Sequence, residues 1–105
     1  MSTQDIIKKQ IADNTIILYM KGNAEMPLCG FSARAVNILK SYGTKFTTVD
    51  VLQDEAIRQA IKVYSNWPTI PQLYIKGEFV GGSDIIAEMH EAGELKGLIN
   101  LVSSS

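Results

Sequence analysis

The chain has 105 residues, 46% of them hydrophobic, which is enough for one domain with a buried core and too few for two comfortable ones. Its 10 Lys and Arg against 11 Asp and Glu give a formal charge of -1, so no broad cationic surface is available for nucleic acid or anionic lipid. No secretory signal or membrane-length apolar run is visible, and a single cysteine cannot form an internal disulfide. We therefore expect a soluble, cytoplasmic protein that binds neither nucleic acid nor membrane.

The first half of the chain predicts a helix followed by a strand, helix and strand. Ser2 and Asp5 have the spacing of a helix capping box, and isoleucines follow at helical intervals. The run 15–20 is apolar on both faces, as in a strand in the middle of a covered sheet. An apolar stripe that begins at Phe31 predicts a helix from residue 29 or 30 to 42, and 45–51 alternates as a strand. A strand, helix and strand in this order make the two strands parallel.

The second half predicts a helix, a tight hairpin and two more helices. The expected elements are a helix over 54–64, hairpin strands over 72–75 and 79–81, and helices over 81–92 and 94–102. The sum is an α/β fold with a four-stranded mixed sheet flanked by helices on both faces. We expect one domain over 1–105, with a frayed serine tail at 103–105.

The cysteine is the first candidate functional residue. Cys29 stands where a loop becomes a helix, and the unpaired amides and helix dipole there lower a thiol pKa and favour a nucleophile or metal ligand. The alternative is a buried structural cysteine. Ser32 occupies the position where a second cysteine would make a redox pair. Lys21, at the end of the first strand, is either a local cation beside the thiol or a solvated lysine.

Two further segments have the composition of a binding site. In Thr69-Ile70-Pro71, a cis proline would turn the Ile70 backbone toward a ligand, although most prolines are trans. In Gly81-Gly82-Ser83-Asp84, glycines precede a helix start whose amides suit a carboxylate, and Asp84 either caps the helix or holds an ammonium group. We expect His90 to be solvated or packed rather than a ligand, and Trp67 to be a packing residue.

These motifs, in this order and spacing, resemble the monothiol glutaredoxins of the Cys-Gly-Phe-Ser type, in particular the short bacterial form. The resemblance rests on Lys21-Gly22, on the segments 27–32 and 67–72, and on Gly81-Gly82-Ser83-Asp84. It implies a thioredoxin-like fold with glutathione lying across the site. The roles it implies are Lys21 and Arg58 for the glycine-end carboxylate, the Ile70 backbone for the cysteine, Ser83 and Asp84 for the γ-glutamyl end, and Cys29 for the sulfur. Many relatives have a second cysteine at position 83, so a mechanism that uses it as a resolving thiol is not open to this chain.

The number of cysteines separates the functional hypotheses. A 2Fe-2S cluster needs four ligands, and this chain supplies one cysteine. The family completes the set with two chains and two glutathiones, which implies a homodimeric cluster carrier in iron-sulfur cluster biogenesis, transfer or iron sensing. It also implies a BolA-type partner and apo iron-sulfur recipients. The alternatives are a glutathione-dependent thiol-disulfide oxidoreductase that uses Cys29, and an interaction module in which Cys29 is incidental.

Overall fold

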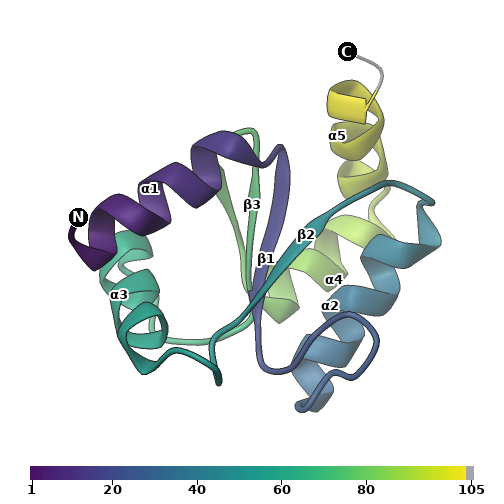
Figure 1. The fold of residues 1–105 in the computed structure, drawn as a ribbon. Coiled ribbons are helices and arrows are strands. Elements are labelled where there is room, and N and C mark those ends of the chain that lie inside the picture. The colour runs from purple at the N-terminus through teal and green to yellow at the C-terminus, as the bar shows by residue number, and fades with distance from the viewer. Residues whose placement is uncertain (104–105) are drawn as a thin grey trace.

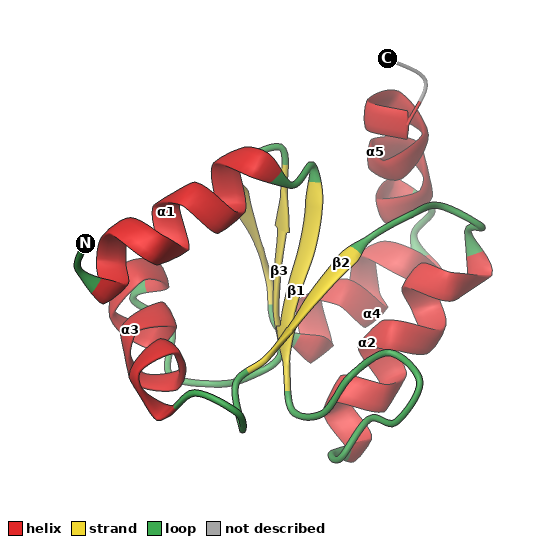
Figure 2. Cartoon of the chain, in the orientation of Figure 1, coloured by secondary structure: helices red, strands yellow, loops and turns green. Residues whose placement is uncertain are grey.

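The computed structural model describes residues 1–103, in which helices and strands follow the predicted order (Figure 2). The elements are α1 (Thr3–Asp13), β1 (Ile16–Met20), α2 (Gly30–Ser41), β2 (Thr47–Asp50), α3 (Glu55–Ser65), β3 (Gln72–Ile75), β4 (Glu78–Gly81), α4 (Ser83–Glu91) and α5 (Glu94–Ser103). Of the expected tail, Ser103 is the last residue of α5, and residues 104–105 lie outside the described part.

The strands form one mixed sheet in the order β2-β1-β3-β4. β1 is parallel to β2 and antiparallel to β3, and β3 is antiparallel to β4. In the register, Leu18 of β1 stands between Thr48 on one side and Leu73 on the other. The predicted parallel pair and hairpin are therefore confirmed, with β1 and β3 in the centre of the sheet.

Helices cover both faces of this sheet (Figure 1). α1 and α3 lie on one face, where Ile7, Ile61 and Tyr19 belong to one core cluster. α2, α4 and α5 lie on the other, where Leu18 and Ile86 belong to a second cluster. All residues of β1 are buried because successive side chains point alternately into these two cores. Within the described residues, no helix is both long and apolar enough to span a membrane.

Local side chains fix where several elements begin and end. Ser2 and Asp5 form the predicted capping box at the start of α1. β2 begins two residues later than predicted and ends one residue earlier. It ends at Asp50 because the chain turns there, and Asp50 Oδ1 accepts the amide of Leu52 at 2.9 Å. The hairpin turn uses Lys76 and Gly77, both with positive φ, as a two-residue turn of the primed type requires. The Ile70–Pro71 peptide bond is cis.

Candidate active site

Cys29 is the N-cap residue of α2, at the end of a loop that follows β1. Its neutral side chain makes no capping hydrogen bond, but the surrounding donors favour the thiolate. The backbone amide of Ser32 lowers the pKa of Cys29 most, partial burial opposes it, and the Phe31 amide, the charge of Lys21 and the Ser32 hydroxyl add to the lowering. The direction of this shift is the one expected for a thiol at the start of a helix.

Ser32 connects the thiol to the end of β1. Its side chain is fully buried, and its Oγ accepts the backbone N–H of Lys21 at 3.1 Å. The hydroxyl proton remains to be donated to the Cys29 thiolate. The position of a second cysteine in a redox pair is thus used here by a hydroxyl that joins the strand end to the thiolate.

The loop between β1 and α2 is held closed by several hydrogen bonds. Gly22 N–H donates to Asp50 Oδ1 at 3.0 Å, Leu28 N–H donates to the Lys21 carbonyl at 2.9 Å, and Lys40 Nζ donates to the Ala24 carbonyl at 2.8 Å. Gly22 has φ +87 and forms an isolated bridge with Pro27. The thiol therefore lies at the end of a loop, residues 21–28, whose backbone is held in place by hydrogen bonds.

Three large apolar side chains around this loop face solvent. Met26, Leu28 and Phe31 are 66, 59 and 61% exposed. Phe31 begins the apolar stripe of α2, but its side chain lines a cleft beside the thiol, and the stripe is buried only from Ala35 onward. Exposed apolar side chains gathered near a reactive group are typical of a contact surface.

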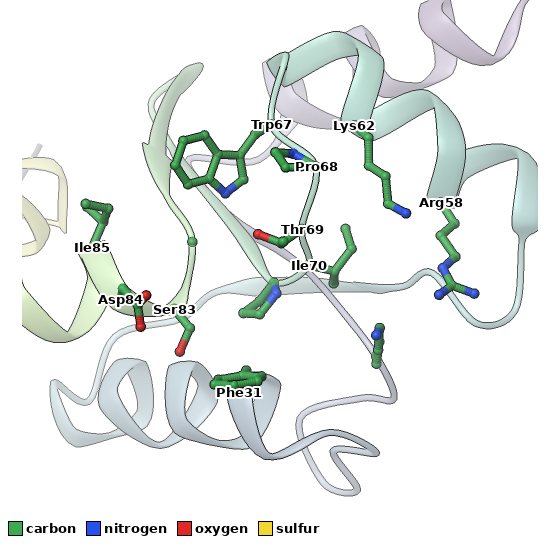
Figure 3. A pocket seen from close by; sticks show the side chains of 13 residues that line it. Phe31, Arg58, Lys62, Trp67, Pro68, Thr69, Ile70, Ser83, Asp84 and Ile85 are labelled. Atoms are coloured by element: carbon green, nitrogen blue, oxygen red, sulfur yellow. The ribbon is translucent and has the colours of Figure 1, made fainter.

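A cleft of about 380 Å³ opens between α3, the loop before β3 and the start of α4 (Figure 3). Its walls are formed by Lys21, Phe31, Arg58, Lys62, Trp67, Pro68, Thr69, Ile70, Pro71, Gly82, Ser83, Asp84 and Ile85. Arg58 and Lys62 extend from α3 on one side, and Ser83 and Asp84 lie on the other. Cys29 is not among the wall residues, but it is two residues from Phe31 and within electrostatic reach of Lys21.

The cleft brings together the five residues that the sequence singled out as binding residues. These are Lys21, Arg58, Ile70, Ser83 and Asp84, which come from separate elements along the chain. Lys62 was not among the predicted binding residues, and Trp67 was expected only to pack. Trp67 is 40% exposed on the cleft wall, and its ring centroid lies 6.0 Å from that of Phe79. Lys62 could have been predicted from the sequence, since it follows Arg58 by four residues and so lies on the same face of the helix.

The charges and the unpaired polar atoms of the cleft are distributed unevenly. Lys21, Arg58 and Lys62 oppose the single acid Asp84 among the wall residues, although Glu55 lies 3.7 Å from Arg58. Arg58 Nε and Ser83 Oγ are both buried and have no hydrogen-bond partner. A buried polar atom without a partner costs about 1–3 kcal/mol, so these two atoms on opposite walls are free to bond to a polar ligand.

The other candidate groups lie outside this cleft. His90 is exposed, and its Nδ1 contacts the hydroxyl of Tyr42, as expected for a packing residue. Within residues 1–103, no group of three His, Cys, Asp or Glu side chains is placed to hold a metal ion.

The chain matches the glutaredoxin family model over residues 16–80. It is 51% identical over 104 residues to glutaredoxin 4 of Haemophilus influenzae, covering 99% of this chain and 97% of that protein. It is 52% identical over 98 residues to glutaredoxin 4 of Escherichia coli, covering 93% and 85%. It is 48% identical over 99 residues to the mitochondrial monothiol glutaredoxin-S4 of rice, covering 94% of this chain but only 54% of the rice protein. The chain thus spans little more than half the length of that plant relative.

Solved structures agree with these relatives. The solution structure of reduced poplar apo GrxS14 superimposes with a TM-score of 0.83 and 43% identity, covering 97% of this chain and 94% of that one. A monomeric truncated mutant of Trypanosoma brucei 1-C-Grx1 gives a TM-score of 0.84 and 41% identity, covering 95% and 90%. The fold is therefore thioredoxin-like, as the resemblance implied. With one cysteine, in Cys29-Gly30-Phe31-Ser32, the chain belongs to the glutaredoxin family as a monothiol member of the Cys-Gly-Phe-Ser type.

Proposed function

We propose that the cleft binds glutathione and that the protein carries a 2Fe-2S cluster as a glutathione-ligated homodimer, in iron-sulfur cluster biogenesis, transfer or iron sensing. The observation that carries the proposal is the pair of buried, unpartnered polar atoms, Arg58 Nε and Ser83 Oγ, on opposite walls of a cleft beside Cys29. A single ligand bonded to both atoms must carry an acceptor for Arg58 Nε–H and, at a separate point, an acceptor or donor for the Ser83 hydroxyl. Glutathione has a carboxylate at each end.

Each end of glutathione has a matching set of groups. The cations Lys21, Arg58 and Lys62 suit the carboxylate of the glycine end, since charge-assisted hydrogen bonds to carboxylates are the strong ones. At the other wall, Ser83 begins α4, so its amide and hydroxyl suit the γ-glutamyl carboxylate and Asp84 suits the neighbouring ammonium. The glutathione sulfur would then lie between the two ends, near Cys29.

The cluster is cargo that one chain cannot hold alone. Cys29 would supply one thiolate and the bound glutathione a second, so two subunits would complete the four ligands. The group fits the residues present, because Cys29 is partly exposed and its pKa is lowered, as a thiolate ligand requires. The exposed side chains of Met26, Leu28 and Phe31 support contact with a second subunit around the thiol.

Anaerobic reconstitution with iron, sulfide and glutathione tests this proposal. We expect a coloured species whose elution volume is that of a dimer, and we expect both the colour and the dimer to be lost in Cys29→Ser. Omission of glutathione should have the same effect as the substitution. A protein that stays colourless under these conditions, or a coloured monomer, would contradict the carrier.

Glutathione binding is tested separately by calorimetry on the protein without cluster. Lys62→Gln should weaken glutathione binding about two- to fivefold, the size of one partly exposed ion pair. The matched control is Lys96→Gln on α5, an exposed lysine outside the cleft, which should leave the affinity unchanged. Equal affinities for the two variants would show that Lys62 does not contact the ligand.

A second function, glutathione-dependent thiol-disulfide exchange, is favoured by the lowered pKa of Cys29. The Cys29 thiolate would attack the glutathione sulfur of a mixed disulfide, forming a Cys29–glutathione disulfide and releasing the substrate thiolate. A second glutathione thiolate would then attack that bond, giving glutathione disulfide and regenerating the Cys29 thiolate. Rapid turnover of a glutathionylated peptide, together with failure to hold a cluster, would favour this function over the carrier.

A further inference from the structure

Three polar residues are buried in the described part of the chain, and they are Ser32, Gln72 and Ser83. Ser32 contacts the thiol and Ser83 lines the cleft, whereas Gln72 does neither. Gln72 is the first residue of β3 and is fully buried. Burying a polar side chain is unfavourable unless its groups are paired, so the partners of Gln72 indicate what it does.

The Gln72 side chain is bonded to the loop that forms one wall of the cleft. Its Nε2 donates to the carbonyls of Trp67 and Thr69, each at 3.1 Å, and its Oε1 accepts the hydroxyl of Tyr74 at 3.1 Å. Both amide protons therefore hold the loop, and the oxygen is held from the sheet. Burial raises the pKa of Tyr74 to about 12, so this hydroxyl stays protonated and remains a donor at neutral pH.

The loop needs such a support because its own sequence offers few backbone donors. Residues 67–71 supply five consecutive wall residues, and two of them, Pro68 and Pro71, have no backbone N–H. The loop lies outside regular secondary structure, between the end of α3 and the start of β3. The two bonds from Gln72 tie its carbonyls to the sheet instead.

One of these bonds sets the direction of the Ile70 amide. In a trans peptide the C=O and the following N–H point in opposite directions, and the Thr69–Ile70 bond is trans. Because the Thr69 carbonyl points at Gln72, the Ile70 N–H points away from it. Ile70 lies on the cleft wall, while its side chain is 7% exposed and belongs to the core on the α1 and α3 face. Its backbone is therefore the polar group that Ile70 has to offer a ligand.

We propose that Gln72 is a positioning residue, which orients the Thr69–Ile70 peptide for ligand binding without touching the ligand. The inference rests on the proposed binding of glutathione in this cleft. Removing the two donors would release the peptide and weaken glutathione binding, whereas the thiol on α2, which Gln72 does not contact, would keep its pKa.

The test compares glutathione binding by calorimetry in the full chain and in three variants. Gln72→Met removes both donors at similar volume, and Gln72→Glu removes them while keeping an acceptor for Tyr74. Tyr74→Phe is the matched control, because it removes a hydrogen bond from the same buried network but leaves both bonds to the loop. We expect the dissociation constant to rise about three- to tenfold in the two Gln72 variants, the equivalent of roughly one hydrogen bond, and to change less than twofold in Tyr74→Phe.

Two further measurements separate positioning from general damage. The pH profile of Cys29 alkylation should be the same in all variants, and the unfolding temperature should fall in Tyr74→Phe as well as in the Gln72 variants. Binding by the unaltered chain together with unchanged binding by the Gln72 variants would overturn this inference alone. No binding by the unaltered chain would overturn the proposed function and this inference with it. Equal loss of affinity in Tyr74→Phe would reduce Gln72 to a structural role.

Discussion

Gly22→Ala should lower the free energy of unfolding for two reasons that can be measured separately, namely backbone strain and steric overlap. Gly22 has φ +87, and a Cβ built on it would lie 2.4 Å from the Met26 carbonyl oxygen and 2.7 Å from the Leu28 nitrogen. Both contacts are to backbone atoms of the loop over residues 21–28, and backbone atoms cannot rotate away from the added methyl group as a flexible side chain does. Gly43 is the control, since its φ is +68 and a Cβ there has nothing within 4 Å.

Only Gly22→Ala carries both costs, which are a left-handed backbone and a steric overlap. A left-handed backbone costs an alanine about 1–2 kcal/mol, which is the whole expected loss for Gly43→Ala. At Gly22 the overlap adds about 1–3 kcal/mol, the usual range for overpacking a closely packed site. The total expected for Gly22→Ala is therefore about 2–5 kcal/mol of the free energy of unfolding.

Urea denaturation at 25 °C measures both losses of free energy, provided that the free energy of unfolding falls with urea concentration at the same slope in the two variants. Because the Gly22 loop leads directly to Cys29, we also expect the pH midpoint of Cys29 alkylation to move in Gly22→Ala and to stay in Gly43→Ala. Equal losses of stability in the two variants would refute the reasoning, since they would show that the loop gives way to the added methyl group at no cost.

Two further predictions concern the thiol and the core. Cys29 alkylation should reach half its maximum below the pH of an ordinary cysteine, and Ser32→Ala should raise that midpoint by removing the hydroxyl donor. The pKa of Cys29 is lower in the folded than in the unfolded chain, so the contribution of this thiol to the free energy of unfolding should grow as the pH rises from the folded to the unfolded pKa. This contribution should be lost as the pH falls through the folded pKa. Urea denaturation at several pH values measures it, and Cys29→Ser should flatten the dependence on pH. On α3, Ile61→Ala, at a fully buried position, should cost about 2–5 kcal/mol in urea denaturation. Val63→Ala, at a side chain 75% exposed, should stay within about 0.5 kcal/mol, and equal losses at both positions would contradict the burial of Ile61.

Features that depend on neighbouring residues could be predicted from the sequence. The capping box of Ser2 and Asp5 is a local pattern, and the structure has it. The run that forms β1 is short, apolar at every position and β-branched at its start, which is typical of a strand with a core on each side. Strand, helix and strand in this order then fix the parallel pair, so the topology followed from local signals and one rule of chain connection.

Features that depend on tertiary packing could not be predicted in the same way. Phe31 continues the apolar spacing of α2, but spacing alone does not say where along a helix the buried face ends. Phe31 lines the cleft and is exposed, whereas Ser32 beside it is buried. Asp50 reads as a strand residue, and only the folded chain brings Gly22 within reach of its carboxylate. Composition at Ile70-Pro71 does not distinguish a cis from a trans bond, and the structure has the cis form.

Ser32 has a defined structural role at the position where a second cysteine would make a redox pair. Its hydroxyl can accept one hydrogen bond and donate another, and it uses both to join Lys21 N–H to the Cys29 thiolate. A cysteine at this position would be a weaker acceptor and donor, and it would offer the Cys29 sulfur a partner within the same chain. With serine there, the Cys29 sulfur can form a disulfide only with a thiol from outside this chain. A cleft with unpaired donors on both walls, next to that sulfur, is where such a group would bind.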